Sequence, residues 1–325
     1  MRTGQGVLRV LHTFEAGQTL PLELGYETYG ELQPDGSNAV LVCHYYTGTM
    51  HAAGTYPEDG LVGWWDNLIG DGKAIDTRKF FVVCMNAPAN VQVIDPRMVS
   101  SGPESIPDFP EVDLKDITRL QFELMQQLGI QKWHAVMGPS YGAMQTLMWG
   151  ALYSGHVQRL GVVAGAPQAA VALKHFFTPT LRHLGQTADG LHEALRLITF
   201  CGMGSDGMEL QFQDQDFDAY LGSRRHFASL KHILSVGETV SRHDIFRHCP
   251  LEQITANWQR AGLKILSVNI LSDQFFPSQP MKDFACQMQQ SGIAHTHMEI
   301  QCKLGHLGCV FETQLFEGAI QKLLE

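Results

Sequence analysis

The first third of the chain shows hydrophobic patterns typical of β-strands. Polar and apolar residues alternate over Val7–Phe14 and Leu20–Tyr29, which predicts an antiparallel pair. Ala39–Cys43 and Phe80–Met85 are instead continuous apolar runs, the pattern of strands that are buried on both faces of a parallel sheet. The polar segment Glu31–Asn38 is expected to connect the second strand to the third.

The next hundred residues alternate between helical and strand patterns. Apolar positions at helical spacing predict a helix over Asp113–Leu128, and Asp113 itself is placed to cap its start. Short apolar runs predict strands at His134–Met137 and Leu160–Ala164, with a helix at Met144–Tyr153 between them. Strands and helices in alternation favour a mostly parallel sheet with helices on its faces.

Strand patterns disappear from about Pro167 to Pro250 and then return. Within this block three segments have helical spacing: Ala170–Leu184, Leu191–Phe200 and Asp216–Val236. The alternation resumes with strand Lys264–Ile270, helix Gln279–Gln290, strand Thr296–Ile300 and helix Val310–Leu324. We therefore predict one α/β core domain made of residues 1–166 and 251–325, with residues 167–250 inserted as a helical lid.

Composition and charge exclude several classes of partner. The 23 basic and 33 acidic residues give a formal charge of −10 and the basic residues are not clustered, so no nucleic-acid partner is expected. Met1–Leu20 lacks a signal-peptide pattern, and no apolar stretch approaches the ~20 residues of a membrane helix. The seven cysteines include no C-x-x-C pair, which favours free thiols in a reducing compartment. We expect a soluble cytoplasmic protein without membrane contact.

A candidate nucleophile follows the predicted strand His134–Met137. Gly138-Pro139-Ser140-Tyr141-Gly142 fits G-x-S-x-G, in which the serine lies on a tight strand-to-helix turn and the flanking glycines relieve crowding. The motif alone is weak, because an ordinary Gly-bounded join between a strand and a helix would match it. Its position between a buried strand and a helix favours Ser140 as the nucleophile of an α/β-hydrolase fold.

An acid and a histidine follow in the chain order of that fold. Asp273 comes after the predicted strand Lys264–Ile270, at the sheet edge where open α/β sheets place their sites. The alternative is that Asp273 caps the following helix, but Ser278 is better placed to do so. His306 is one of fifteen histidines, and its position in a Gly-flanked loop after the last predicted strand selects it as the general base.

These residues predict nucleophilic acyl chemistry. His306 would remove the Ser140 proton during attack on an ester or thioester carbonyl, while Asp273 orients the imidazole and stabilises its cation. Two backbone N–H groups must then meet the oxyanion. We expect them to come from Tyr141, the residue after the nucleophile, and from Tyr46 in the loop after Ala39–Cys43.

Several motifs together resemble the homoserine O-acetyltransferase family of the α/β-hydrolase superfamily, which includes short-chain ester hydrolases. The likeness spans most of the chain outside the lid, and the most specific motif is Gly-Trp-Trp-Asp, followed by Asn-Leu-Ile-Gly. The segments that carry it are Cys43–Gly48, Gly63–Gly70, Ile75–Cys84, Pro107–Pro110, Val112–Gly129, Ser140–Trp149 and Asp273–Pro277. The resemblance implies a ping-pong reaction in which acetyl-CoA or succinyl-CoA acylates the serine and an amino-acid hydroxyl accepts the acyl group. It also implies no tightly bound cofactor and a homodimer formed through the lid.

The chain departs from this family where homoserine is bound. Family members usually have Asp after the catalytic His, where this chain has Leu307, and a lid Arg at the position of Leu195. Arg196 lies one residue later, about 100° around the helix, and Arg196 and Leu307 are the candidate substrate contacts. The family loop at residues 89–103 is also altered, retaining only Ser-Gly-Pro at its end, and Tyr141 replaces a common Met.

The sequence is consistent with three hypotheses for the function. The first is an acyltransferase that uses homoserine or another hydroxy compound, and the second is a hydrolase of small acyl esters. The third is a catalytically silent α/β-hydrolase scaffold that binds a ligand, against which the complete Ser140, Asp273 and His306 set argues. No phosphate loop, dinucleotide motif or metal cluster is found, and His44 and His51 lack zinc-ligand spacing. The expected partners are therefore a small-molecule acyl donor and acceptor.

Overall fold

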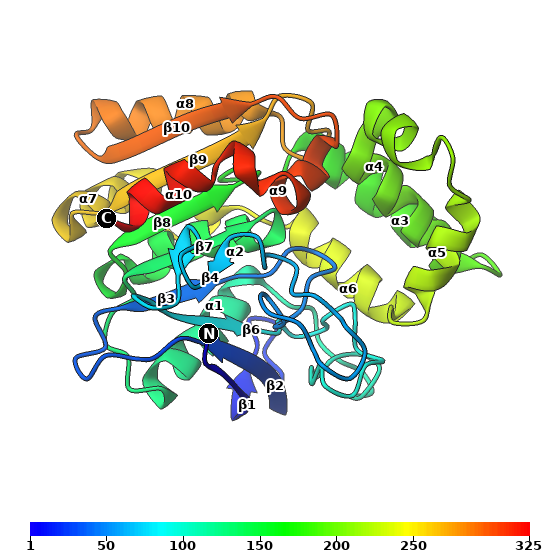
Figure 1. Ribbon diagram of the computed structural model, residues 1–325, viewed down its shortest axis with the longest axis horizontal. Helices are drawn as coiled ribbons and strands as arrows, with labels where there is room; N and C mark the ends of the chain where they lie inside the picture. The colour runs from blue at the N-terminus through cyan, green and yellow to red at the C-terminus, as the bar shows by residue number, and fades with distance from the viewer.

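The computed structural model describes residues 1–325 and is built around an eight-stranded sheet (Figure 1). Its strand order is β1-β2-β6-β3-β7-β8-β9-β10. Strand β2 pairs antiparallel with β1 and with β6, whereas β6, β3, β7, β8, β9 and β10 run parallel to one another. The strands are β1 Thr3–Thr13, β2 Thr19–Tyr29, β3 Ala39–Val42, β6 Phe81–Met85, β7 Ala135–Pro139, β8 Arg159–Val163, β9 Lys264–Ile270 and β10 Ala294–Ile300. A separate pair contains β4 Ile69–Gly70 and β5 Ile75–Asp76. The predicted fold class is confirmed.

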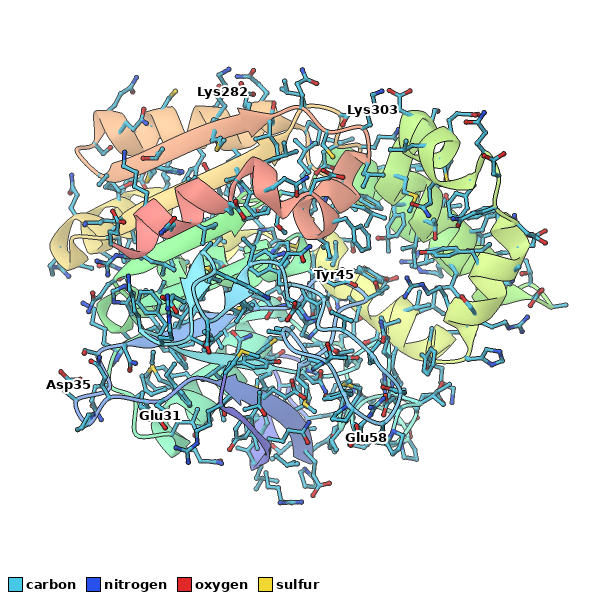
Figure 2. The ribbon with its side chains drawn as sticks, viewed as in Figure 1. Glu31, Asp35, Tyr45, Glu58, Lys282 and Lys303 are labelled. Atoms are coloured by element: carbon cyan, nitrogen blue, oxygen red, sulfur yellow. The ribbon has the colours of Figure 1, made fainter.

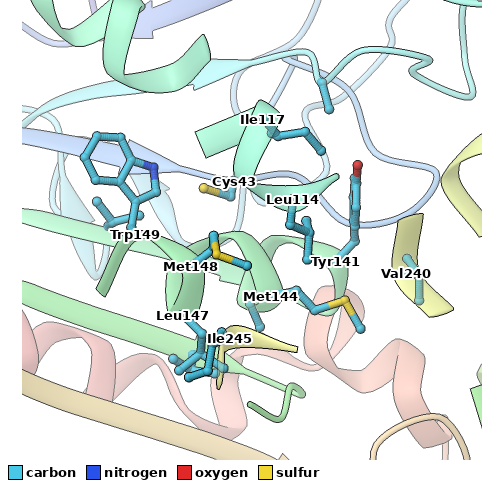
Figure 3. Packing of buried hydrophobic residues seen from close by; sticks show 14 of the residues in the cluster. Cys43, Leu114, Ile117, Tyr141, Met144, Leu147, Met148, Trp149, Val240 and Ile245 are labelled. Atoms are coloured by element: carbon cyan, nitrogen blue, oxygen red, sulfur yellow. The ribbon is translucent and has the colours of Figure 1, made fainter. Parts of the chain in front are cut away.

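Helices cover both faces of the sheet and create two apolar cores. One core lies against α1 Leu114–Gln127, α2 Tyr141–Tyr153, α7 Leu251–Ala261 and α8 Ser278–Gln290. The other lies against α9 Gly308–Phe311 and α10 Glu317–Leu324, and it includes Trp65 and Leu68. Figure 3 shows Met144, Leu147 and Met148 of α2 in the first core, together with Leu114 of α1.

The side chains of the central strands divide between these two cores because successive residues point to opposite faces. In β3, Ala39 and Leu41 belong to the first core. Val40 and Val42 belong to the second. Both faces are therefore apolar, which explains why the central strands are continuous hydrophobic runs instead of alternating ones.

Residues 167–250 contain helices and no strand of the sheet. After a π-helical turn at Leu173–Phe177, the helices are α3 Thr178–Leu184, α4 Gly190–Phe212, α5 Phe217–Arg225 and α6 Leu230–Ser241. They stand beyond the carboxyl ends of the parallel strands, at the right of Figure 1. The carboxyl ends of the strands are also where open α/β sheets place their sites, so the insertion is positioned as a lid.

Several predicted helix bounds were wrong. The helix expected at Asp216–Val236 is two helices, because Ser229 caps a new start by accepting from the His232 N–H. The expected helix at Leu191–Phe200 continues as α4 to Phe212, with a break at Gly204, whose φ is 68°. Helix α7 had not been predicted. None of the helices is long and apolar enough to cross a membrane.

The last predicted helix, Val310–Leu324, is also interrupted. It consists of α9, a 3-10 turn at Thr313–Leu315 and α10. Phe316 is 1% exposed and has a φ of −139°, so the chain leaves helical geometry where this ring enters the second core. The break before α10 therefore coincides with the burial of one aromatic side chain.

Candidate active site

Ser140 lies on a strained turn between β7 and α2. Its φ is 57° and its ψ is −117°, a conformation that non-glycine residues rarely adopt and that is costly away from functional sites. The glycines on either side are required by contact with Cys43 at the end of β3. A Cβ at Gly138 would lie 2.3 Å from the Cys43 carbonyl oxygen, and one at Gly142 would lie 2.1 Å from it. The G-x-S-x-G sequence therefore seats the serine directly against the loop that follows β3.

His306 connects Ser140 to Asp273 through two short hydrogen bonds. Its Nε2 lies 2.7 Å from the Ser140 Oγ, and its Nδ1 lies 2.6 Å from the Asp273 Oδ2. Since a carboxylate accepts, Nδ1–H donates to Asp273 and Nε2 is free to accept the serine proton. All three residues are buried. The predicted placement of these residues is thereby confirmed, including the loops that carry Asp273 and His306.

The loops around the histidine hold it in this orientation. The other oxygen of Asp273, Oδ1, accepts from the backbone N–H groups of Phe275 and Phe276 at 2.7 and 2.9 Å. Asp273 thus organises its own loop and does not cap α8, which begins at Ser278 without a side-chain cap. The Phe276 ring stacks on His306 with centroids 5.4 Å apart. The expectation that Ser278 caps this helix was wrong.

The loop after β3 brings Tyr46 toward Ser140. The backbone N–H groups of Tyr46 and Tyr141 donate to no loop or side-chain acceptor, and both residues line the cavity that contains Ser140. The phenol of Tyr46 donates to the Ile233 carbonyl of α6, which ties this loop to the lid. Both predicted oxyanion residues are thus beside the nucleophile, and their role remains a proposal.

The buried His44, for which the sequence predicted no metal-binding role, braces this loop. His44 donates through Nδ1 to the Tyr45 carbonyl at 2.8 Å, and its Nε2 accepts from the Ala87 N–H at 3.0 Å. Both contacts are satisfied only by the neutral ring. Burial lowers the pKa of His44 to about 4, which keeps that neutral form at ordinary pH.

The altered loop at residues 89–103 supplies two further braces. Asn90 donates to the Gly48 carbonyl at 2.9 Å, and Gln92 donates to the Thr47 carbonyl at 2.6 Å. The sequence shows that this loop departs from the family pattern but does not predict its role. The signal available in the sequence was only the presence of amide side chains, and nothing in it indicated which carbonyls they reach.

The cavity at Ser140 is closed largely by apolar side chains and contains no Asp, Glu, Lys or Arg. Its empty volume is about 520 Å³. Tyr141 of α2 and Val240 of α6, both labelled in Figure 3, contribute to its wall. Leu307 packs against Gly202 of α4. Apart from the triad, the polar groups in its lining are those of Tyr45, Tyr46, Thr47 and Tyr141.

Comparison with known proteins identifies the family. A family model described as the alpha/beta hydrolase fold matches residues 38–296. A solved homoserine O-acetyltransferase from Bacillus anthracis is 30% identical, with a TM-score of 0.85, over 100% of this chain and 97% of that chain. The chain belongs to the homoserine O-acetyltransferase family of α/β hydrolases. The resemblance stated from the sequence is confirmed.

Relatives of this family member carry out more than one kind of acyl chemistry. A structure titled esterase E22 is 27% identical, with a TM-score of 0.86 and full coverage of both chains. A homoserine O-succinyltransferase from Halothiobacillus neapolitanus is 47% identical over 162 residues, which are 47% of this chain and 40% of that protein. The match thus covers about two fifths of the length of this curated relative.

The two candidate substrate contacts, Leu307 and Arg196, have different positions relative to the cavity. Leu307 lines the cavity next to His306, as expected from its place in the sequence. Arg196 does not line it: its guanidinium pairs with Asp218 at 2.7 Å and with Glu193 at 3.2 Å on the outer side of α4. Leu195 is 6% exposed and occupies the inward position. We therefore remove Arg196 from the candidate site.

Proposed function

We propose that this chain transfers a short acyl group from an ester or acyl-CoA through an acyl-enzyme on Ser140, and that homoserine is not the preferred acceptor. The acyl-enzyme is attacked either by a small uncharged hydroxyl compound or by water. These two outcomes, transfer and hydrolysis, use the same residues and differ only in the second nucleophile. The likeness to esterase E22 supports hydrolysis, and the family supports transfer.

The observation that carries the proposal is that the cavity at the complete triad is lined by no Asp, Glu, Lys or Arg. Homoserine is a zwitterion, and each of its charges needs a fixed partner when it leaves water. Leu307 and Leu195 stand where the family usually has Asp and Arg, and Arg196 is engaged by two carboxylates. Polar groups left unpaired in a closed site cost about 1–3 kcal/mol each, so an uncharged acceptor suits this cavity better.

Acylation would proceed by transfer of the Ser140 proton to Nε2 of His306 as Oγ bonds to the acyl carbon. The developing oxyanion would receive hydrogen bonds from the backbone N–H groups of Tyr46 and Tyr141. His306 would then give the proton to the departing alcohol or thiol. Asp273 would stabilise the imidazolium throughout, through the 2.6 Å contact to Nδ1.

Deacylation would reverse these roles. The hydroxyl of the acceptor, or water, would lose its proton to His306 while its oxygen attacks the acyl carbon, and the proton would return to the Ser140 Oγ. No bound cofactor takes part in this scheme. Acetyl-CoA would act as a substrate that supplies the acyl group.

Parallel assays with one preparation test the proposal. Acetyl-CoA is incubated with and without homoserine, and hydrolysis of short acyl esters is measured beside it. We expect ester turnover to exceed homoserine acetylation in kcat/KM, Ser140→Ala to abolish both, and a serine-directed phosphonate to label Ser140 alone. Saturable homoserine acetylation well above the ester rate would contradict the choice of acceptor, and labelling of another serine would contradict the nucleophile.

We also propose that two copies associate through the lid, as the family resemblance implies. Five large apolar residues of the insertion are exposed, at 75%, 58%, 46%, 60% and 49%: Val171, Phe176, Phe200, Leu210 and Phe227. Isolated exposed apolar residues are common, but a group of them on one helical insertion favours an interface.

A further inference from the structure

A second cavity adjoins the one that contains Ser140. Its empty volume is about 710 Å³, and it shares Tyr45, Thr47, Ile198 and Leu307 with the first cavity. Tyr45, labelled in Figure 2 where the core faces the lid helices, belongs to both walls. The second cavity extends past Leu307 to Phe227 and Phe311, whose side chains are each 49% exposed. It is therefore the outer chamber of the same site.

Arg224, in the last turn of α5, is the one charged residue that lines the outer chamber. Its side chain makes no salt bridge and no hydrogen bond within the chain, whereas every other arginine of residues 167–250 pairs with a carboxylate. These paired arginines are Arg182, Arg196, Arg225, Arg242 and Arg247. The chain as a whole has a formal charge of −10, so acidic groups are abundant. Arg224 is thus the one arginine of residues 167–250 that has no carboxylate partner.

The guanidinium is nevertheless held near the boundary of the two cavities. Its central carbon lies over the Tyr220 ring, 5.2 Å from the centroid, in a cation–π contact. Burial raises the pKa of the Tyr45 phenol, and the positive charge of Arg224 opposes that rise, which places the charge within electrostatic reach of the shared wall. The stacked ring limits the motion of the side chain and leaves its five N–H donors unused.

We infer that Arg224 binds an anionic group on the leaving part of the substrate. The inference rests on the proposed function, in which the scissile carbonyl lies at Ser140. An ester or thioester would place its acyl group in the inner cavity and extend its alcohol or thiol part past Leu307 along the apolar wall of the outer chamber. A carboxylate or phosphate at the end of that part would meet the guanidinium, which forms bidentate hydrogen bonds with either group.

Matched substrates and neighbouring arginines test this site. The first pairs are acetate esters of ω-hydroxy carboxylic acids of graded chain length, each compared with the same acetate ester whose carboxylate is methylated. The second pair is acetyl-CoA and acetyl-pantetheine, which lacks phosphate. We expect the wild type to prefer the anionic member of at least one pair. Arg224→Gln should lower that preference about tenfold, through KM and not kcat, and Arg224→Lys should restore part of it. The preference should also weaken as salt is raised.

The adjacent Arg225 is the control, because it pairs with Asp189 at 3.4 Å and does not line the chamber. Arg225→Gln should leave the ratio between anionic and neutral substrates unchanged. An equal loss in both variants would reduce the effect to overall charge and overturn the inference, as would a wild type without any preference. The pair that responds identifies whether carboxylate or phosphate is the ligand.

The inference can fail independently of the proposed function. If no ester or thioester is turned over, the proposed function is refuted, and binding still tests Arg224. Calorimetric titration of Ser140→Ala protein with CoA and with the ω-hydroxy acids should then show binding that Arg224→Gln weakens about tenfold. Equal affinity with and without that substitution would refute the anion site.

Discussion

Gly142→Ala tests whether the Ser140 turn and the loop after β3 depend on direct contact. A Cβ at Gly142 would lie 2.1 Å from the Cys43 oxygen and 2.8 Å from its carbonyl carbon, whereas ordinary contacts begin at 3.4 Å. The loop would have to retreat by more than an ångström, and the Tyr46 amide would move with it. An N–H···O bond lengthened by about 1 Å is effectively lost, and loss of one oxyanion donor lowers kcat by about 10²–10³.

Helix stability cannot account for such a loss. Gly142 has no positive φ and lies inside α2, where alanine is the better helix former by about 1 kcal/mol. The control is Gly155→Ala, because a Cβ there has no neighbour within 4 Å and the residue follows α2 in a 3-10 turn. Steady-state ester hydrolysis gives kcat and KM for each variant, and thermal unfolding shows that each is folded.

A folded Gly142→Ala protein with kcat within threefold of the wild type would refute this reasoning. It would mean that the oxyanion is bound elsewhere or that the loop yields without moving its donors. If the variant does not fold, Gln92→Ala applies the same test more gently. It removes the 2.6 Å brace to the Thr47 carbonyl and should lower kcat about tenfold with little change in the melting temperature.

Three further predictions concern acid stability, the acceptor and assembly. The folded pKa of His44, about 4, lies below the ordinary 6.5, so the unfolded chain binds more protons between these values and the free energy of unfolding should fall as pH drops from 6.5 to 4, by about 3 kcal/mol for this residue. Urea unfolding at a series of pH values gives this free energy, which should depend less on pH in His44→Asn. The exposed His175→Asn should show the same pH dependence as the wild type. Leu307→Asp combined with Leu195→Arg should raise kcat/KM for homoserine at least tenfold, and an unchanged value would mean that the cavity differs in shape as well as charge. Leu210→Glu should shift a lid-mediated dimer toward monomer in analytical ultracentrifugation, and a wild type that is monomeric at every concentration would dismiss that interface.

The sequence by itself determined the sheet and the order of the reactive residues. Continuous apolar runs such as Ala39–Cys43 indicate strands buried on both faces, and this local property does not depend on which strand lies alongside. G-x-S-x-G between a strand and a helix identified Ser140, and the loops after the last two strands identified Asp273 and His306. Parallel strands bring their carboxyl ends to one edge, so the topology alone predicts that these distant residues meet.

Only the tertiary structure decided what surrounds the three reactive residues. Hydrophobic periodicity shows where a helix can form, but it did not reveal the new helix start that Ser229 caps or the break at the buried Phe316. The braces from His44 and Gln92 depend on the Ala87 N–H and the Thr47 carbonyl, which long-range packing places within reach. The sequence alone does not show whether Arg196 or Arg224 is paired with a carboxylate. One is neutralised by carboxylates and the other faces a cavity, because the packing of α4 and α5 determines which groups are neighbours.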